Sequence, residues 1–497
     1  MDYLKILSNF SFGRVDAETD DKLINCFIGT DLLKYALAPQ HTLLLGGKGS
    51  GKSAIFRILS QEAERLSPII NISFRELFRI PAYGLNSDEY LTYAEIKDLN
   101  PQTIDDFKYF WQLYFCLKTS YSIVNSNYLN SFINKSGSLN LKSNHQFLRD
   151  LLSDIGLLKK QEQKSKNILE KIKNILQTYK IPSTVNYSSK TNLNVNLILE
   201  KIDKILKETN SFVWILVDQI DLLYLDNLDK RNKAITALIQ LMIEYSNRFT
   251  NINFKIFLRT DIYKELKIVN KSHLISNSIE LVWNEDLILR MILARAIYDR
   301  DVKQFCEEKI KETVDINRVV TGNNQFLLKV FYTIFQEKAF NNNTKLHQWI
   351  IKKLTDGLGK IYPREFIHLA NLAIAEQRAI YKKMQPNGEY LISEKAVKSA
   401  FKLVSKYRCE TYLFAEFPHL TKHFNKLSEF GFDRIKKEEL FKLFEDCNPS
   451  GIDALRAFYD AGLLKTINNK SIDTAQEYII PDLYKYGLGL TKRKHKS

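Results

Sequence analysis

Short apolar runs alternate with amphipathic helical patterns in the first part of the chain. His41–Leu45 is a mostly apolar run of the kind that forms a buried strand, and Lys52–Ser67 places apolar residues at helical spacing. Pro68 ends that helix, and the apolar run Ile69–Phe74 predicts a second strand. A strand, a glycine-rich turn, a helix and a strand, in that order, indicate an α/β domain with a parallel sheet.

Apolar runs return after residue 210. Three further predicted strands are Ser211–Asp221, Phe254–Asp261 and Ser278–Trp283, and a helical pattern over Lys230–Phe249 separates the first two. The first two of these strands end in charged residues. Because ligands of parallel sheets gather at the carboxyl ends of the strands, we expect a site at that edge.

Residues 85–205 differ in composition and are rich in Asn, Ser, Lys and Tyr. Residues 105–119 are apolar on much of their surface and predict a buried helix. Residues 158–180 predict a basic amphipathic helix with seven lysines and two glutamates, and residues 181–196 predict a loop. We interpret the region as a mostly helical insertion. Its basic helix is more simply a solvated face than a DNA contact, and both interpretations stay open.

Helical patterns continue to about Lys383, and residues 385–390 form a predicted linker. Beyond it, helices alternate with two short extended pieces, 463–467 and 477–481, around an Asn-Asn turn. Helices followed by a small hairpin predict a winged-helix domain at the C-terminal end.

The composition narrows the class of protein. The 497 residues are 45% hydrophobic and 26% charged, which suits a globular protein of several domains. No apolar run is long enough to span a membrane, and the N-terminus lacks the apolar region of a signal peptide, so we expect a cytoplasmic protein. The five cysteines are scattered, which argues against a disulfide framework or a zinc site. The net charge of +15 suits nucleic acid or another polyanion.

The stretch GGKGSGKS, Gly46–Ser53, fits the pattern G-x-x-x-x-G-K-[ST] at every fixed position. Glycines let the backbone approach a ligand closely, and successive N–H groups at the start of a helix form a site for phosphate. Lys52 can reach the β- and γ-phosphates, and the hydroxyl of Ser53 can ligate Mg²⁺. A strand before the motif and a helix after it disfavour the alternative, a glycine turn without a ligand. The predicted ATP-binding residues are Gly46, Gly47, Lys48, Gly49, Ser50, Gly51, Lys52, Ser53 and Ala54.

A buried strand delivers acidic residues that suit the same site. Asp218 ends the apolar run FVWILVD and is the predicted second ligand of Mg²⁺. Asp221 is a candidate general base or water-orienting group, and the alternative is that it caps a helix. Gln219 stands where many ATPases with an additional central strand carry a glutamate, and an amide cannot accept a proton at neutral pH. Either Asp221 is the base, or hydrolysis is slow and Gln219 only orients a water.

Two arginines are candidate sensors of the γ-phosphate. If the strand that ends at Arg259 and Thr260 lies between the other two central strands, both residues emerge beside that phosphate; the alternative is a surface arginine at a strand end. Pro363 starts a helix and places Arg364 in its first turn, where a cation opposes the helix dipole. Arg364 is then held either by a nucleotide phosphate or by a neighbouring acid.

In combination and order, these motifs resemble the STAND and Cdc6/Orc-like side of the AAA-type P-loop ATPases. They resemble more closely a bacterial set of stand-alone P-loop ATPases that are encountered in mobile-element and antiphage-defence neighbourhoods. The matching segments are FGRVDAE (12–18), LGGKGSGKSAIF (45–56), WILVDQID (214–221), FLRTDIY (257–263), ELVWNEDLILRMILARAI (280–297), YPREFIHLANLA (362–373) and IPDLYKYGLGL (480–490). They span nearly the whole chain.

The resemblance implies an α/β P-loop sheet with an additional central strand (ASCE type), a helical insertion, a helical lid and a C-terminal winged helix. The implied domains are 1–40, which flanks the adenine site, 41–283, the core with its insertion, 284–384, the lid, and 391–497, the winged helix. It also implies Arg259 as the first sensor, Arg364 as the lid sensor, and Phe12 and Gly13 beside the adenine. The segment 261–279, where an oligomerising relative often has its arginine finger, contains no arginine.

We therefore expect a slow Mg²⁺-dependent ATPase that acts as a switch in bacterial defence, coupled to a protein effector or to self-association. The alternative is a DNA-binding ATPase resembling origin-recognition or transposition loaders, and a third class holds ATP structurally. The best candidate for reading DNA, residues 450–464, has one arginine and two aspartates and is a poor groove reader. The basic helix 158–180 and the tail 491–497 could contact phosphates without sequence selectivity, and no membrane partner is expected.

Overall fold

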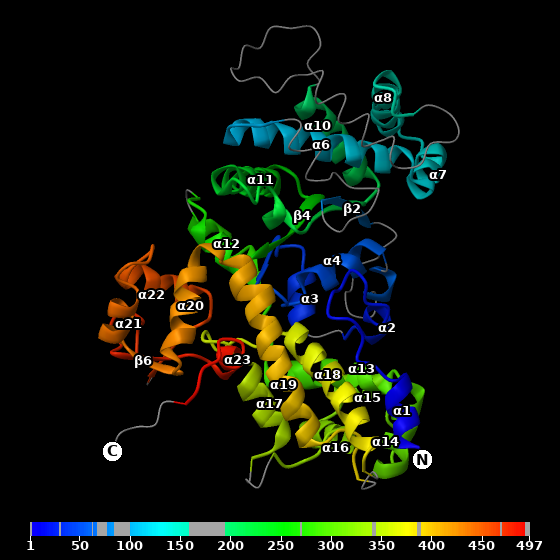
Figure 1. Cartoon of the computed structure of the whole chain (residues 1–497). Helices are drawn as coiled ribbons and strands as arrows, with labels where there is room; N and C mark the ends of the chain where they lie inside the picture. Colours follow the sequence, from blue (N-terminus) through cyan, green and yellow to red (C-terminus); the bar gives the residue numbers. More distant parts are fainter. Residues whose placement is uncertain are drawn as a thin grey trace. The chain divides into compact units, whose positions relative to one another are not determined.

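The computed structural model describes residues 2–28, 31–61, 63–66, 77–83, 100–158, 194–268, 271–339, 344–384, 389–467 and 470–492. The chain divides into two compact units (Figure 1). The sheet unit consists of Gly29–Lys48 and Lys52–Leu281, and the helical unit consists of Met1–Ile28, Gly49–Gly51 and Val282–Ser497.

Five parallel strands form the sheet of the sheet unit. They are β1 (Leu43–Gly46), β2 (Leu77–Tyr83), β3 (Phe212–Val217), β4 (Ile252–Arg259) and β5 (Ser278–Glu280), in the spatial order β2-β3-β4-β1-β5. β4 lies between the other two central strands, so the prediction of an additional central strand is confirmed. The register pairs Gly46 with Arg259, which brings the end of β4 to the start of the glycine-rich loop.

The predicted strands at 41–45, 211–221, 254–261 and 278–283 correspond to β1, β3, β4 and β5, in each case within a few residues. β1, β3 and β4 form because their apolar side chains are buried on both faces, as in other parallel sheets covered by helices, whereas β5 at the edge is only partly buried. The predicted strand Ile69–Phe74 lies outside the described residues. The strand β2, which precedes the insertion, begins three residues later at Leu77.

Helices surround the sheet, and a helical insertion separates β2 from β3. The helices of this unit are α3 (Asp31–Leu37), α4 (Lys52–Gln61), α6 (Ile104–Val124), α7 (Asn127–Lys135), α8 (Leu139–Asp154), α10 (Val195–Glu208), α11 (Leu228–Arg248) and α12 (Thr260–Glu265). The predicted buried helix 105–119 is α6, which begins with a capping box between Thr103 and Asp106. α6 packs beside α11 (Figure 1). Trp111 of α6 donates a hydrogen bond to the carbonyl of Ala234 on α11. Apart from Leu158, the predicted basic helix 158–180 lies outside the described residues, as does the predicted loop 181–196 up to residue 193.

One buried lysine interrupts the apolar run of β4. Lys255 is fully buried, and its Nζ donates hydrogen bonds to the carbonyls of Ala36 (3.2 Å), Ala38 (2.7 Å) and His41 (2.7 Å). The amine also lies 4.7 Å from the ring centroid of Trp214. These contacts tie the segment after α3 to the middle of the sheet.

The helical unit begins with helices and ends with a small antiparallel sheet. Its helices are α1 (Tyr3–Asn9), α2 (Leu23–Cys26), α13 (Glu285–Ile297), α14 (Arg300–Ile310), α15 (Ile316–Thr321), α16 (Asn324–Ile334), α17 (Leu346–Leu354), α18 (Pro363–Tyr381), α19 (Glu394–Arg408), α20 (Thr421–Phe430), α21 (Lys437–Leu443), α22 (Gly451–Asp460) and α23 (Asp482–Lys485). The strands β6 (Arg434–Lys436), β7 (Lys465–Thr466) and β8 (Glu477–Ile479) lie in the order β6-β8-β7. The order α20, β6, α21, α22, β7, β8 along the chain confirms the winged-helix prediction, and β6 is a strand that the sequence pattern did not predict.

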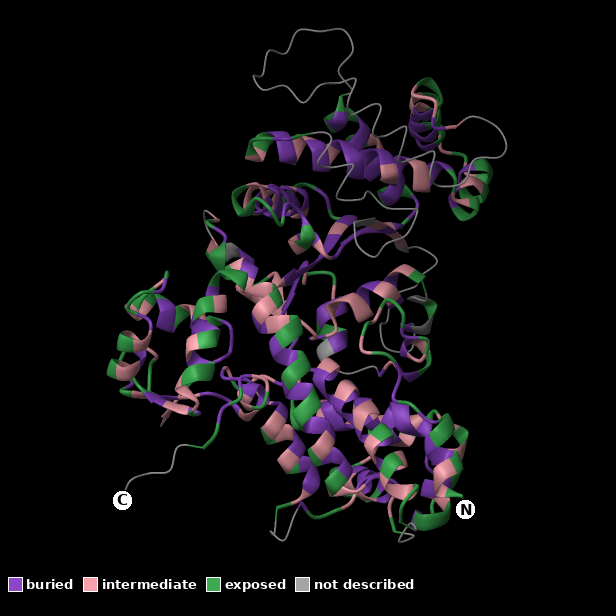
Figure 2. Ribbon diagram, viewed as in Figure 1, coloured by how far each residue is buried: buried purple, intermediate pink, exposed green. Residues whose placement is uncertain are grey.

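One continuous apolar core runs through the helical unit, from α1 to the last residues after α23. Figure 2 shows the buried residues of these elements in purple. The segment after α23 packs tightly on α19: the N–H of Gly487 bonds to the hydroxyl of Ser405 at 3.0 Å, and a Cβ at Gly487 would lie 2.3 Å from Sγ of Cys409. Lys353 of α17 also forms an ion pair with Asp482 at 2.8 Å. Among the described residues, no helix combines the length and hydropathy that a membrane crossing requires.

Candidate active site

Two glycines set the path of the loop between β1 and α4. Gly49 has a φ of +90° and Gly51 a φ of +94°, a region that residues with a side chain avoid. The loop starts at Gly46, the last residue of β1, and ends where α4 begins at Lys52. It therefore leads directly into the N-terminus of a ten-residue helix, whose free N–H groups and dipole favour an anion.

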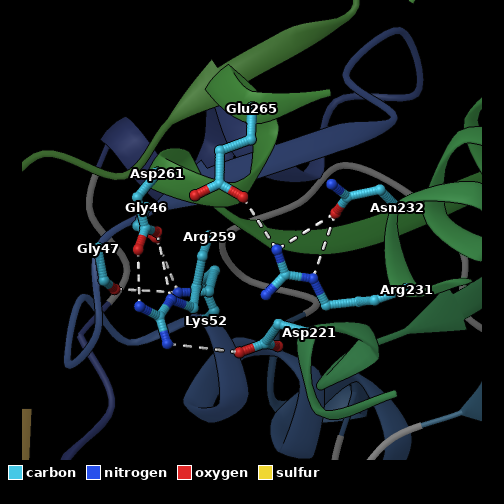
Figure 3. Close-up of polar contacts among 9 residues, drawn as sticks. All are labelled: Gly46, Gly47, Lys52, Asp221, Arg231, Asn232, Arg259, Asp261 and Glu265. Carbon is cyan, nitrogen blue, oxygen red and sulfur yellow. Dashed lines mark hydrogen bonds and ion pairs between the residues drawn. The ribbon is translucent and has the colours of Figure 1, made fainter. Parts of the chain in front are cut away.

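Lys52 bends back over this loop. Its Nζ donates hydrogen bonds to the carbonyls of Gly46 and Gly47, both at 2.9 Å (Figure 3). Burial lowers the pKa of Lys52, and the nearby carboxylates of Asp221 and Asp218 oppose that effect. An ammonium group can only donate hydrogen bonds. Lys52 therefore bonds to carbonyl oxygens of the loop and leaves the loop's backbone N–H groups available to donate to a phosphate.

Asp218 follows β3 and is buried beside the start of α4. Burial raises the pKa of Asp218 to about 6, although a hydrogen bond from the Ser53 hydroxyl and the charge of Lys52 act to lower it. Its Oδ2 atom is buried and has no hydrogen-bond partner among the described residues. A buried carboxylate oxygen without a donor, next to a serine hydroxyl, fits a bound cation.

The fit is to Mg²⁺ together with phosphate oxygens. Mg²⁺ is usually held by one or two protein oxygens, with substrate phosphates and waters completing the octahedron. Within the described ranges there is no group of three or more His, Cys, Asp or Glu side chains that could hold a metal by themselves. Ser53 and Asp218 could therefore hold Mg²⁺ only in company with a ligand that brings its own oxygens.

The chain turns sharply after Asp218. Gln219 has φ +58° and ψ +21°, a left-handed conformation that is uncommon outside glycine. This turn places Asp221 in a short 3₁₀ helix, with Oδ2 3.8 Å from Nη1 of Arg259. The long helix that follows, α11, is capped by Asn227, so Asp221 is not its cap. The carboxylate of Asp221 faces the end of β4.

Arg259 lies at the end of β4, and two carboxylates face it. Its Nε donates to Oδ1 of Asp261 at 3.2 Å and its Nη2 to Oδ2 at 2.6 Å, while Nη1 faces Asp221 (Figure 3). Burial tends to raise the pKa of Asp261, but the hydrogen bonds and charge of Arg259 outweigh it and the pKa is lowered. Thr260 bonds instead to Oε1 of Glu280, at 3.0 Å. The edge of the sheet thus brings together Lys52, Ser53, Asp218, Asp221 and Arg259.

Arg364 lies in the first turn of α18, in the helical unit. Its Nη2 forms an ion pair with Oδ1 of Asp16 at 3.1 Å, and its Nε is buried without a hydrogen-bond partner in the part of the chain that the structure describes. Within the same unit, a Cβ at Gly49 would lie 3.0 Å from Cβ of Arg364. The acid that the sequence left as an alternative is therefore present, and the role of Arg364 as a lid sensor stays a prediction.

Phe12 and Gly13 lie in the core of the helical unit. The Phe12 ring is fully buried against Phe10, with ring centroids 4.6 Å apart. Asn371 accepts from the N–H of Phe12 at 2.8 Å and donates to the carbonyl of Gly13 at 2.7 Å. Gly13 has a φ of +89°, and a Cβ there would lie 2.4 Å from the guanidinium of Arg295. Contact of Phe12 and Gly13 with an adenine stays a prediction.

Three residues at these sites were not singled out from the sequence. Asp261 accepts two hydrogen bonds from the guanidinium of Arg259. Asp16 forms an ion pair with Arg364. Trp283 donates from Nε1 to the carbonyl of Ser50 at 2.8 Å. Asp261 could have been found, because it stands two residues after Arg259 where a strand passes into a helix. The other two contacts join residues more than 200 positions apart, and no local pattern indicates them.

The family model described as ORC-CDC6-like matches residues 9–276, more than half of the 497-residue chain. No curated protein matches the sequence. Among solved structures, the chain is similar to the Orc1 protein of Aeropyrum pernix, determined in complex with DNA. The identity is 12%, the match covers 96% of each chain, and the TM-score is 0.33, so this likeness carries no argument about what the present chain binds.

Proposed function

Because the chain belongs to the ORC-CDC6-like family, we propose that it binds ATP with Mg²⁺ at the loop Gly46–Ala54 and works as a slow, ATP-hydrolysing switch. The observation that carries the proposal is the buried Oδ2 of Asp218, which has no hydrogen-bond partner among the described residues and adjoins the hydroxyl of Ser53. A cation held by this oxygen, the hydroxyl of Ser53 and the phosphates of a nucleotide on the loop would supply its partner. A glycine turn without a ligand, or a carboxylate with only a structural role, would not require a buried oxygen that lacks a hydrogen-bond partner.

The loop would hold the phosphates through its backbone N–H groups and Lys52, and Ser53 and Asp218 would hold Mg²⁺. The metal would neutralise charge on the phosphates during transfer to water. In the family pattern, Arg259 would sense the γ-phosphate and Arg364 would act from the lid, 284–384. The proposed division also includes 1–40, with Phe12 and Gly13 near the adenine, a core over 41–283, and a winged helix over 391–497.

Slow hydrolysis follows from the residues after Asp218. Gln219 cannot take a proton from the attacking water, so Asp221 is the candidate base. The contact of Asp221 with Arg259 orients its carboxylate but also engages it in an ion pair. We propose that the chain holds ATP for long periods and that turnover depends on a partner.

A steady-state phosphate-release assay tests the base. Asp221→Asn should leave ATP binding intact and lower turnover by about 10²-fold or more, as expected for a lost catalytic base. Asp229→Asn is a matched control, because Asp229 is exposed on α11 and pairs with Lys233. Normal turnover in Asp221→Asn would remove Asp221 from the mechanism and leave water positioning by Gln219 as the route.

The second candidate is a DNA-bound ATPase, favoured by the net charge of +15 and the winged-helix fold. Against it, the candidate recognition helix α22 carries Asp453 and Asp460, and its Arg456 is engaged by Asp473 at 3.3 Å. Adding duplex DNA to the same assay separates the two. Strong stimulation, with an affinity that falls steeply with salt, would favour the DNA-bound ATPase.

A role in bacterial defence, with a protein effector or self-association, is the part of the proposal that rests on the resemblance alone. No arginine is present in 261–279, so ring assembly with a finger from that segment is not proposed. The basic helix 158–180 and the tail 491–497, of which 159–180 and 493–497 lie outside the described residues, remain candidates for non-specific contact with phosphates. The phosphate-release assay with purified candidate effectors addresses this part.

A further inference from the structure

The end of β4 contains an arginine whose side chain has two different acidic neighbours. Arg259 presents the Nε–Nη2 edge of its guanidinium to both oxygens of Asp261, at 3.2 and 2.6 Å. The remaining nitrogen, Nη1, lies 3.8 Å from Asp221. A two-point contact fixes both the position and the plane of a guanidinium. Asp261 is therefore the anchor of Arg259, and Asp221 is the group that Nη1 faces.

The anchor itself is held by the start of α12. Asp261 lies in the first turn of this helix, where nearby backbone N–H groups act to lower the pKa of its carboxyl. Acidic side chains are stabilised at this end of a helix. The backbone of β4 fixes the other end of the pair, because Arg259 is in register with Gly46 at the entrance to the loop. Both partners are thus attached to rigid elements next to the proposed phosphate site.

We propose that Asp261 is a positioning residue that holds the guanidinium of Arg259 at the edge of the phosphate loop, so that the chain distinguishes ATP from ADP. This inference rests on the proposed function. Without the carboxylate of Asp261, Arg259 alone would not discriminate between ATP and ADP. Lys52 belongs to the same charge cluster, since the charges of Arg259 and Asp261 both act on it.

The same short helix offers a matched control. Glu265 also lies on α12, but its carboxylate pairs with Arg231 of α11 at 2.9 Å rather than with Arg259 (Figure 3). Glu265→Gln removes one negative charge from α12 and leaves the fork on Arg259 intact. Asp261→Asn removes one negative charge and also the paired hydrogen bonds from Arg259, because an amide offers only one acceptor oxygen.

The experiment is a calorimetric titration of the full chain with ATP and with ADP, both in the presence of Mg²⁺. We expect Asp261→Asn to weaken ATP binding by about tenfold, the value of one charge-assisted contact, and to leave ADP binding unchanged. Glu265→Gln should keep the wild-type ratio of ATP to ADP affinity. Arg259→Lys, which keeps the charge but cannot take a two-point contact, should behave like Asp261→Asn.

A double variant distinguishes positioning from a general effect on the fold. If Asp261 acts only through Arg259, Arg259→Gln with Asp261→Asn should have the same affinity ratio as Arg259→Gln alone. An unchanged ratio in both Asp261→Asn and Arg259→Lys, with a wild-type chain that does discriminate, would overturn this inference and leave the proposed function standing. Failure of the wild-type chain to bind either nucleotide would overturn both.

Discussion

Lys255 places an amine in the middle of an apolar sheet. Burial lowers the pKa of Lys255 to about 7, from the 10.5 of an exposed lysine. Backbone carbonyls of Ala36, Ala38 and His41 accept its hydrogen bonds, so the side chain fastens the segment before β1 to β4. Burial of the amine is unfavourable, but its hydrogen bonds fix the start of β1, the strand that leads into the phosphate loop.

The lowered pKa of Lys255 predicts a specific dependence of stability on pH. Between about pH 7 and 10 the unfolded chain binds more protons than the folded chain, so the free energy of unfolding should rise with pH, by at most about 1.4 kcal/mol per unit. Lys255→Met should remove this contribution. Urea unfolding of both proteins across that range measures the difference, and the account of Lys255 is wrong if the two curves run parallel.

At the scale of single residues, the site was predictable where its chemistry is local. Lys52 and Ser53 follow from the spacing of the glycine motif, and Asp218 follows from its place after an apolar strand. The partner of Arg259 was not predicted, because the choice between Asp221 and Asp261 depends on how the turn after β3 meets α12. Arg364 and Asp16 are 348 positions apart, a distance at which only the folded chain decides the pairing.

At the scale of elements, the long apolar patterns predicted the structure most closely, and the short strand β6 was missed. β3, β4, α6 and α11 have many buried apolar side chains in a row or at helical spacing, and each was expected close to its position. β6 has three residues, of which only Ile435 is fully buried, and such a segment has no period to detect. It forms because β8 supplies its hydrogen-bond partners.

The junction of α18 and α19 depends on one buried ion pair. Glu365 and Arg408 are both at most 5% exposed, and Nη1 lies 2.7 Å from Oε1. The guanidinium also stacks on Tyr412, 3.8 Å from the ring centroid. Glu365 is adjacent to Arg364 in the first turn of α18, so this pair sets the position of the turn that carries the predicted lid sensor.

Removal of one partner should destabilise the helical unit strongly. Arg408→Met leaves the carboxylate of Glu365 buried without its counter-charge, which typically costs about 3–5 kcal/mol. Lys303→Met is the control, because Lys303 and Glu307 form an exposed pair on α14 that should contribute less than about 1 kcal/mol. Chemical unfolding of the three proteins measures both values. Equal stability of Arg408→Met and the wild type would show that the pair does not hold α18 to α19.

At the scale of the whole molecule, the continuous core of the helical unit constrains any switch. The same apolar cluster includes α13, α18, α19 and the helices and strands of the winged-helix part. The segment at Gly487 packs so closely on α19 that an added Cβ would lie 2.3 Å from Sγ of Cys409. A nucleotide that moves α18 should therefore move the winged-helix part with it, as one body.

The central claim is that the loop Gly46–Ala54 holds Mg²⁺-bound ATP, and calorimetric titration of ATP into the full chain tests it most directly. The wild-type chain should bind one ATP per chain in the presence of Mg²⁺. Lys52→Ala, which removes the cation that reaches the β- and γ-phosphates, should abolish the binding heat while the thermal unfolding of the chain is unchanged. Equal binding by the wild type and Lys52→Ala would place the nucleotide elsewhere, and no binding by the wild type would contradict the account as a whole.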